Sequence, residues 1–282
     1  MQHTLPIIVV NGVIDAQVSP LDRGFTYGDG VFETCKMIES TIPLWNFHCE
    51  RLLHSCKKLS IAVDVDVIEA QLKNLISEVD SEDKKSAIIK IIVTRGQGGR
   101  GYNISNLGSP TMVIGIFPAT PYPEAHFSKG VKVRLCNQRL GCNSSLAGLK
   151  HLNRLEQILA RAEWQDETIA EGIVLDVNEN LIEAVFSNIF LAKNGELITP
   201  DLSEAGVAGV MRRFIIENLA PQAGLHTHIK KCALNDLVNA DEVFLCNSNY
   251  GIWPVTELLT GQSYRFPVGE ITRRLQKLLP SQ

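Results

Sequence analysis

Short apolar runs separated by turn signals mark the first part of the chain. Residues 7–10 and 13–14 flank an Asn-Gly dipeptide, which is a strong local signal for a β-hairpin. Residues 47–59 and 67–79 carry apolar side chains at the spacing of an amphipathic helix. Further strand-like runs lie at 31–39, 87–94 and 112–117. The pattern therefore predicts a domain that mixes strands with two helices.

Three prolines within residues 118–123 interrupt this pattern. Proline fixes its own φ angle and offers no N–H group, so such a segment resists both helix and sheet. We therefore expect an interdomain linker at 118–127. It would separate a small N-terminal domain, 1–117, from a larger C-terminal domain, 128–282.

Strand-like runs dominate after the linker. They lie at 131–136, 172–177, 181–185, 188–192 and 242–246. Helical patterns are expected at 151–164, 209–219 and 271–279. Because helices and strands mix without a regular βαβ rhythm, the sequence predicts an α+β fold rather than a doubly wound sheet.

The composition excludes several classes of protein. The chain has 282 residues, a net charge of −4 and no long basic block. This balance argues against nucleic acid or an anionic membrane surface as the main partner. The chain contains no run of eighteen apolar residues, so no membrane span is predicted. The start of the chain lacks a signal-peptide pattern. We expect a cytoplasmic protein.

Seven cysteines are scattered along the chain without a Cys-x-x-Cys pair. They stand at positions 35, 49, 56, 136, 142, 232 and 246. An odd, dispersed set predicts free thiols in a reducing compartment. The cysteine pattern supports neither a disulfide framework nor a zinc site, and we expect no metal.

Three charged residues could carry chemistry, but each also has an ordinary structural interpretation. Lys150 lies between a loop and a predicted helix, where a lysine is usually solvated. Glu183 lies in a mostly apolar strand, where a buried carboxylate would need a partner and an outward-facing one would not. Arg51 lies on a predicted helix and would ordinarily face solvent. Individually, these residues do not identify an enzyme.

The segment 95–102, Arg-Gly-Gln-Gly-Gly-Arg-Gly-Tyr, is rich in glycine. It lacks the spacings of a dinucleotide loop or a P-loop, so it is not read as a nucleotide site. A mobile loop and an arginine-bearing loop over a binding site both remain open.

Five motifs, taken in order, resemble the fold-type IV enzymes that use pyridoxal 5′-phosphate (PLP). The motifs are 22–34, 48–52, Lys150, Glu183 with Ser187-Asn188, and 209–212. The resemblance extends from about residue 10 to residue 255. It implies a smaller N-terminal α/β domain, a larger C-terminal mixed α/β barrel-like domain, PLP as cofactor, and a homodimer.

Three stretches are similar to the aminodeoxychorismate lyases within this family, at 95–102, 148–161 and 240–249. That branch implies a carbon–oxygen lyase which converts 4-amino-4-deoxychorismate to 4-aminobenzoate and pyruvate, a step towards folate. The D-amino acid and branched-chain aminotransferases remain the alternative, because residues 27–33 also resemble the D-amino acid enzymes. A non-catalytic carboxylate-binding protein on the same scaffold is a third interpretation.

The resemblance implies a set of residues that contact the cofactor. Lys150 would form the Schiff base with the cofactor aldehyde and then act as general base. Glu183 would keep the pyridine nitrogen protonated, which also gives its buried carboxylate a partner. A phosphate group favours an arginine and N–H donors at a helix start. The residues that fit this role are Arg51, Val210, Met211 and Ser248.

The substrate implied by the resemblance carries two carboxylates. Arg100 is therefore the candidate clamp, because a guanidinium group can bind a carboxylate through two hydrogen bonds. Tyr102 and Tyr27 are expected beside it. Thr34 matches a threonine of the family and is the candidate that relays a proton to the leaving group.

Overall fold

The computed structural model describes residues 4–105, 108–119 and 121–279. These residues form two compact units. The first unit contains the chain up to Pro121 together with Leu149–Asn153, and the second contains Tyr122–Gly148 and the chain from Arg154 onward. Thr120, within the predicted linker, lies outside the described residues, as do the ends of the predicted domains at 1–3 and 280–282.

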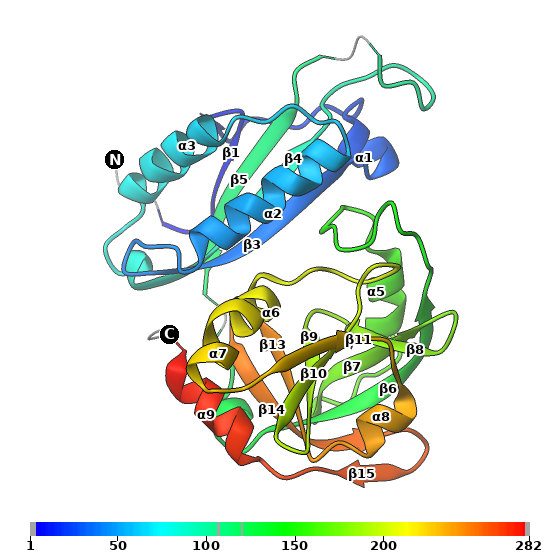
Figure 1. The fold of residues 1–282 in the computed structure, drawn as a ribbon. Helices are drawn as coiled ribbons and strands as arrows, with labels where there is room; N and C mark the ends of the chain where they lie inside the picture. Colours follow the sequence, from blue (N-terminus) through cyan, green and yellow to red (C-terminus); the bar gives the residue numbers. More distant parts are fainter. Residues whose placement is uncertain (1–3, 106–107, 120, 280–282) are drawn as a thin grey trace. The chain divides into compact units, whose positions relative to one another are not determined.

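The first unit is built on a five-stranded antiparallel sheet with the order β2-β1-β5-β4-β3. Its strands are β1 (Ile7–Val10), β2 (Val13–Ile14), β3 (Gly30–Ile38), β4 (Ser86–Thr94) and β5 (Thr111–Pro118). Two long helices, α2 (Trp45–Lys58) and α3 (Val65–Glu78), cover one face of the sheet (Figure 1). A short helix, α1 (Arg23–Tyr27), precedes β3, and a 3₁₀ turn, η1 (Asp83–Lys85), precedes β4. The predicted hairpin and both predicted helices are confirmed.

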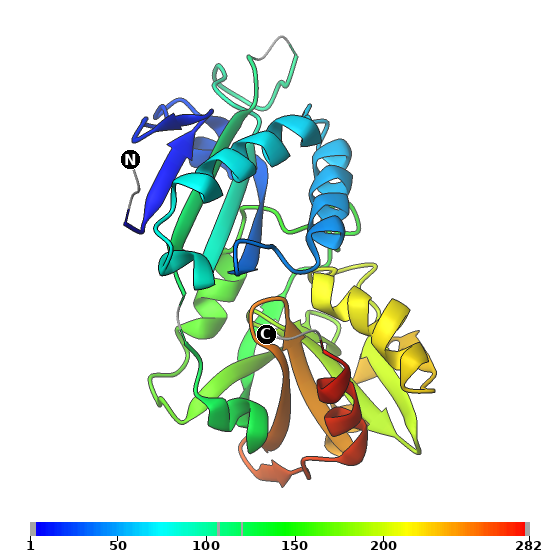
Figure 2. The same cartoon turned by 90° about the vertical axis from the view of Figure 1, so that its left-hand side faces the viewer.

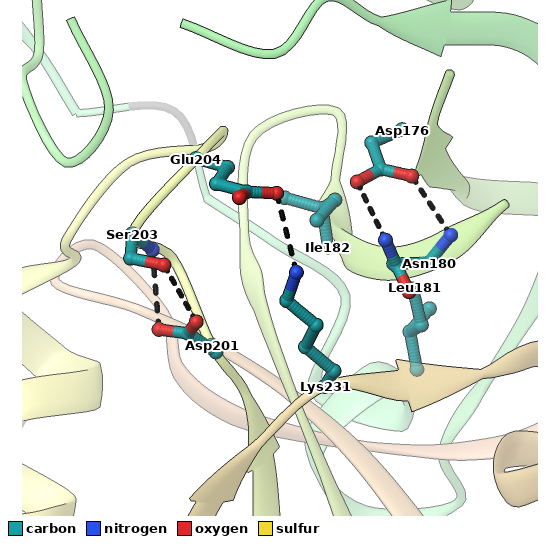
Figure 3. A pocket seen from close by; sticks show the side chains of 8 residues that line it. All are labelled: Asp176, Asn180, Leu181, Ile182, Asp201, Ser203, Glu204 and Lys231. Atoms are coloured by element: carbon teal, nitrogen blue, oxygen red, sulfur yellow. Dashed lines mark hydrogen bonds and ion pairs between the residues drawn. The ribbon is translucent and has the colours of Figure 1, made fainter. Parts of the chain in front are cut away.

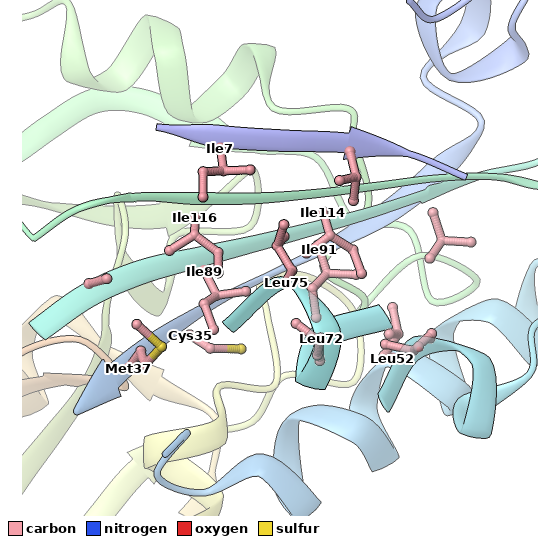
Figure 4. Packing of buried hydrophobic residues seen from close by; sticks show 14 of the residues in the cluster. Ile7, Cys35, Met37, Leu52, Leu72, Leu75, Ile89, Ile91, Ile114 and Ile116 are labelled. Carbon is pink, nitrogen blue, oxygen red and sulfur yellow. The ribbon is translucent and has the colours of Figure 1, made fainter. Parts of the chain in front are cut away.

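Buried apolar side chains at alternate positions along the strands form the core of the first unit. Ile89 and Ile91 on β4, like Ile114 and Ile116 on β5, are fully buried on the face that the helices cover. Leu72 of α3 packs against them (Figure 4). Because successive strand side chains point to opposite faces, one sheet face is apolar while the other can carry polar groups.

Residues Leu149–Asn153 lie along the free edge of β3. The Phe32 amide donates to the Lys150 carbonyl at 2.9 Å, and the Leu152 amide donates to the Gly30 carbonyl at 3.0 Å. These bonds require extended backbone, so the helix predicted at 151–164 is too long. The helix α5 spans only Leu155–Arg161. A division at 118–127 would also assign 149–153 to the C-terminal domain, whereas they group with the first unit.

The second unit is built on a ten-stranded mixed sheet with the order β11-β10-β9-β13-β14-β6-β7-β8-β12, and β15 pairs with β14. The sheet curls so that β8 also contacts β9 and β10. The strands are β6 (Val131–Leu140), β7 (Ile169–Asp176), β8 (Asn180–Ala184), β9 (Asn188–Lys193), β10 (Glu196–Pro200), β11 (Thr227–Lys230), β12 (Cys232–Ala233), β13 (Glu242–Asn247), β14 (Gly251–Leu259) and β15 (Ser263–Arg265). The predicted α+β class is confirmed.

Short helices surround this sheet. They are α4 (Glu124–Ser128), α5, α6 (Val210–Phe214), α7 (Ala220–Gln222), α8 (Leu234–Val238) and α9 (Glu270–Leu278), with a π-helical turn η2 (Ile215–Leu219) between α6 and α7. Helix α9 packs against β13 and β14 (Figure 2). Its first amides, those of Ile271 and Thr272, donate to the buried carboxylate of Glu242 at 3.0 and 2.8 Å. No helix in the described ranges is long and apolar enough to span a membrane.

The second half of the predicted linker is structured. Residues Glu124–Ser128 form α4, and the Phe127 carbonyl accepts hydrogen bonds at 3.0 Å from both Arg273 and Gln276 of α9. Pro118 ends β5, and Pro123 stands immediately before α4, a position where proline is tolerated.

Candidate active site

Lys150 is positioned by the backbone bonds between its segment and β3. Its Nζ atom lies 4.4 Å from the centre of the Phe32 ring, a distance at which an ammonium group is attracted by the face of the ring. Burial raises the pKa of Cys35 and lowers that of His48; the positive charge of Lys150 opposes the first shift and adds to the second, so the amine lies near both residues. The predicted nucleophile is therefore held on the first unit by a strand edge rather than at a solvated helix end.

Arg51 lies on α2 and faces inward. Its Nε and one terminal nitrogen donate to the two carboxylate oxygens of Glu33 at 2.7 and 2.5 Å. His48, one helical turn earlier, contacts the same carboxylate through Nδ1 at 2.7 Å. Only 11% of the Arg51 side chain is exposed, so the interpretation of a solvated helix residue is wrong.

The buried cluster of Glu33, His48 and Arg51 has a defined charge distribution. Burial alone would raise the pKa of Glu33, but the positive charge of Arg51 and the bond from His48 lower it to about 2. Burial lowers the pKa of His48; the hydrogen bond and charge of Glu33 oppose this shift, and the charges of Arg51 and Lys150 add to it. The cluster therefore holds an anionic Glu33, a neutral His48 and a cationic Arg51. The Nε2 atom of His48 is buried without a hydrogen-bond partner in the described structure.

Thr34 lies on β3 next to Glu33 and therefore points to the opposite face of the sheet. It shares that face with Phe32, against which the Lys150 amine lies. Thr34 and the ring that the Lys150 amine contacts therefore lie on the same face of β3. Neither Glu33 nor His48 was predicted as a site residue, although both lie within the motifs that carry the family resemblance.

The glycine-rich loop begins with a fully engaged arginine. Arg95 pairs with both oxygens of Asp29, at 2.7 and 2.9 Å, and donates to the carbonyls of Ser60 and Leu59 at 3.0 and 2.7 Å. Arg23 also donates to Asp29, at 2.9 Å. Hydrogen bonds from the two arginines lower the pKa of the Asp29 carboxyl, although burial opposes them. Arg95 is therefore a structural anchor of the loop.

The far end of the same loop is fastened to α1. Arg23 donates to the Gly101 carbonyl at 2.9 Å, and the Gly101 amide donates to the Tyr27 hydroxyl at 3.1 Å. The rings of Tyr27 and Tyr102 meet edge to face, with centroids 5.6 Å apart. Arg100, directly before Gly101, is exposed and forms no hydrogen bond or ion pair with the described part of the chain. All three predicted substrate residues thus lie at one place.

Glu183 lies on β8 in the second unit, with 4% of its surface exposed. Its Oε2 atom accepts hydrogen bonds from the Val207 amide at 2.8 Å and from the Asn188 side chain at 3.5 Å. The interpretation of an outward-facing glutamate is therefore wrong. The segment around Val207 is in turn tied to Gly148, because the Gly148 amide donates to Gly206 at 2.9 Å and the Ala208 amide donates to Gly148 at 3.0 Å.

Val210 and Met211 form the first turn of α6. The preceding Gly209 has extended backbone and provides no side-chain cap, so the first amides of this helix lack intrahelical partners. A Cβ atom at Gly209 would lie 1.8 Å from Asn188 Oδ1, which requires glycine at this position. Helix α6 packs against β13, and Ser248 follows directly after β13 in a turn stabilised by Asn247.

Glu171 on β7 is a buried carboxyl that the sequence did not single out. It is fully buried and accepts hydrogen bonds from the Ser187 hydroxyl at 2.9 Å and from the amides of Phe186 and Gly172 at 3.2 and 3.1 Å. The Tyr250 hydroxyl donates to the same serine at 2.6 Å. Burial raises the pKa of Glu171 to about 8, and the negative charge of Glu183 acts in the same direction.

A surface pocket of the second unit lies elsewhere on the sheet (Figure 3). Six of its eight lining residues are polar, and hydrogen bonds or ion pairs join several of them. The lining comprises Asp176, Asn180, Leu181, Ile182, Asp201, Ser203, Glu204 and Lys231. None of the residues predicted for cofactor or substrate lines this pocket, so the candidate site does not coincide with it.

Comparison with known proteins identifies the family. The model of the amino-transferase class IV family matches residues 30–258 of the chain. The chain belongs to this family. Membership confirms PLP as the cofactor expected from the motifs, and it confirms the fold-type IV architecture.

Several of the similar proteins are aminodeoxychorismate lyases. An aminodeoxychorismate lyase of Vibrio harveyi is 37% identical over 95% of this chain and 97% of its own length. The crystal structure of 4-amino-4-deoxychorismate lyase from Pseudomonas aeruginosa is 44% identical, covers 96% of this chain and 97% of its own, and superposes with a TM-score of 0.90. A putative branched-chain-amino-acid aminotransferase of Methanocaldococcus jannaschii is 30% identical over 93% of this chain and 90% of its own.

The raised pKa of Glu171 predicts a pH dependence of stability. The folded pKa lies above the ordinary value near 4.5, so the folded protein binds one more proton than the unfolded chain between about pH 4.5 and pH 8. The contribution of this group is fully present below pH 4.5 and is lost as the pH rises through about 8. The loss should be on the order of a few kcal/mol, because one pKa unit corresponds to about 1.4 kcal/mol.

The comparison of wild type with Glu171→Gln measures this effect, because the amide cannot ionise. Denaturant unfolding from pH 5 to pH 8.5 should show that wild type loses stability relative to Glu171→Gln as the pH rises. Glu124→Gln, which changes an exposed glutamate of the same unit, should stay parallel to wild type. Parallel curves for wild type and Glu171→Gln would show that Glu171 is ionised in the folded protein.

Proposed function

We propose that this protein is a PLP-dependent lyase that converts 4-amino-4-deoxychorismate to 4-aminobenzoate and pyruvate. The observation that carries the proposal is the similarity to two aminodeoxychorismate lyases over at least 95% of the chain, at 37% and 44% identity. The substrate is a ring with an amine, a carboxylate and an enolpyruvyl ether. Loss of the ether makes the ring aromatic, so the protein needs chiefly to remove one proton at the right carbon.

The buried polar groups of both units fit the cofactor. Glu183 is a carboxylate held in an apolar strand, as a protonated pyridine nitrogen requires. The first turn of α6 offers amides without a capping side chain, as a phosphate requires. When bound, PLP supplies an aldehyde that condenses with amines and an electron-poor ring that accepts electrons. Val210, Met211, Ser248 and Arg51 are proposed to hold its phosphate.

Lys150 is proposed as both the anchoring amine and the general base. Lys150 and Arg51 both act on the pKa values of Cys35 and His48, so the cation of Arg51 lies near the amine. A neighbouring cation favours the neutral amine, which is the form that can take a proton, whereas the face of the Phe32 ring attracts the ammonium form. Lys150 would take the proton from the amine-bearing ring carbon, and Thr34, on the same face of β3, would relay a proton to the leaving group.

Glu33 acts through Arg51. A free arginine side chain has many rotamers, whereas two bonds to one carboxylate leave a single orientation. We infer that Glu33 fixes the orientation of the guanidinium group that is proposed to bind the phosphate. The residue is thus a positioning residue for cofactor binding.

The loop 95–102 is proposed to select the substrate. Its two ends are fixed, by Arg95 to Asp29 and by Gly101 to Arg23 and Tyr27, while Arg100 between them is exposed. Arg100 is proposed to bind a carboxylate of the substrate, with Tyr27 and Tyr102 beside it. By the resemblance to the family we also propose a cytoplasmic homodimer.

The primary test is product analysis with the PLP-loaded protein and enzymatically made 4-amino-4-deoxychorismate. Pyruvate and 4-aminobenzoate should form in equal amounts without any amino-group acceptor. Lys150→Ala should abolish turnover, whereas Lys129→Ala, which alters an exposed lysine, should not. Borohydride reduction followed by peptide mapping should place the pyridoxyl group on Lys150. Product formation that requires a keto acid would instead identify an aminotransferase.

Glu183→Gln tests the partner of the ring nitrogen. The amide keeps the shape but removes the charge, so turnover should fall at least about 100-fold, which is about 2.7 kcal/mol. Much of the cofactor should stay bound. Glu167→Gln, at an exposed glutamate of the same unit, is the control. Near-normal turnover in Glu183→Gln would contradict the assignment.

Arg100→Ala tests the substrate clamp. Loss of a bidentate partner for a carboxylate should reduce kcat/KM by about 2–5 kcal/mol, while cofactor affinity and the visible spectrum stay unchanged. Arg100→Lys should recover only part of the loss, because an ammonium cannot form the same pair of bonds. Arg265→Ala, at an exposed arginine, should have no effect. Full activity in Arg100→Ala would show that Arg100 is an ordinary solvated residue and does not bind the substrate.

A further inference from the structure

Two histidines and a glutamate meet at one edge of the sheet in the second unit. His226 directly precedes β11 and His228 is the second residue of this strand, so their side chains, two residues apart, share a face. Strand β10 runs parallel to β11, with Ile198 opposite His228 (Figure 1). The Leu197 amide donates to the His226 carbonyl at 3.0 Å, which places Glu196, the first residue of β10, beside the histidines.

The three side chains direct one atom each towards a common point. His226 Nδ1 lies 3.1 Å from His228 Nε2, and His228 Nε2 lies 3.0 Å from Glu196 Oε2. All three atoms lie within 4.8 Å of one another. The side chains of His228 and Glu196 are 41% and 56% exposed, so the cluster is open to solvent on one side.

Hydrogen bonds alone cannot pair all three of these atoms well. If His228 Nε2 carries a proton, that single N–H must be shared between His226 and Glu196. If it carries none, its lone pair faces the carboxylate of Glu196, which has only lone pairs to offer. A cation that accepts one lone pair from each of the three atoms removes this conflict.

We propose that Glu196, His226 and His228 form a binding site for a divalent transition-metal ion of the zinc type. Two imidazole nitrogens and one carboxylate oxygen are a common ligand set for Zn²⁺, with a water as the fourth ligand. Tetrahedral bonds of about 2.0–2.1 Å separate neighbouring ligand atoms by about 3.3 Å. The separations of 3.0 and 3.1 Å need to widen by only a few tenths of an ångström.

The surroundings permit a cation. Lys230, which is two residues beyond His228 and on the same face, lies 3.9 Å from the carboxylate of Asp236. Its positive charge is therefore compensated by a neighbour. Strand β11 ends the sheet and pairs only with β10 within the described strands, so a metal between Glu196 and the histidines would fasten an edge strand to its neighbour. The pattern of cysteines in the sequence gives no sign of this site, because its ligands are a glutamate and two histidines thirty or more residues further along the chain.

The test is Zn²⁺ binding to the PLP-loaded full-length protein, measured by isothermal titration calorimetry in chelator-free buffer. Wild type should bind one Zn²⁺ that is lost, or weakened at least tenfold, in His226→Ala and in His228→Ala. His54→Ala, which removes an exposed histidine of the first unit, should bind like wild type. Cys142→Ser should also bind like wild type, although Cys142, Asp176 and Glu204 form a second group of potential ligands.

Two further readouts distinguish this site from other zinc sites. Zn²⁺ should raise the melting temperature of wild type but not of His228→Ala. X-ray absorption of the one-to-one complex should show nitrogen and oxygen neighbours, including imidazole, without sulfur. Unchanged affinity in both histidine variants, or a sulfur neighbour that disappears in Cys142→Ser, would overturn the proposal. Neither result depends on lyase activity, so failure here is separate from failure of the proposed function.

Discussion

The exposed edge of β3 is the constraint on which the first unit depends. One face of this strand packs on the helices, and the backbone groups at its first residues, on the outer edge, would remain unpaired without a neighbour. The segment Leu149–Asn153 supplies that neighbour through bonds to Phe32 and Gly30. The same bonds hold the Lys150 backbone extended and place its amine over the Phe32 ring. Strand pairing and the position of the predicted nucleophile are therefore one feature of the structure.

The buried carboxyl groups differ in ionisation state, and the neighbours of each group determine that state. Glu33 has a bidentate arginine and is anionic, with a pKa of about 2. Glu171 has hydrogen-bond donors but no cation among the described residues that act on it, and burial raises its pKa to about 8. Near neutral pH the second group is protonated, which leaves Glu183 as the negative charge of its region. A neutral neighbour removes a repulsion that would otherwise oppose an ionised Glu183.

The glycine-rich loop 95–102 is bonded to the rest of the first unit at its two ends. Asp29 binds Arg95 at the start of the glycine-rich loop, and Arg23 binds both Asp29 and Gly101 near its end. The glycines Gly96 and Gly101 adopt positive φ angles of 86° and 85°, which favour glycine. Arg100 is thereby presented from a fixed base while its own side chain stays in solvent.

The sequence alone determined most elements of the fold, because the spacing of apolar residues along the chain shows which side chains of a helix or strand are buried. Lys150, Glu183 and Arg51 became candidate site residues only through motifs in a fixed order, since each also has an ordinary local interpretation. The short helix α5, the neutral Glu171 and the meeting of Glu196 with His226 and His228 were decided by the tertiary structure. Each depends on partners distant in the chain: a strand edge that competes with helical bonds, a buried site that removes water, and two parallel strands in register.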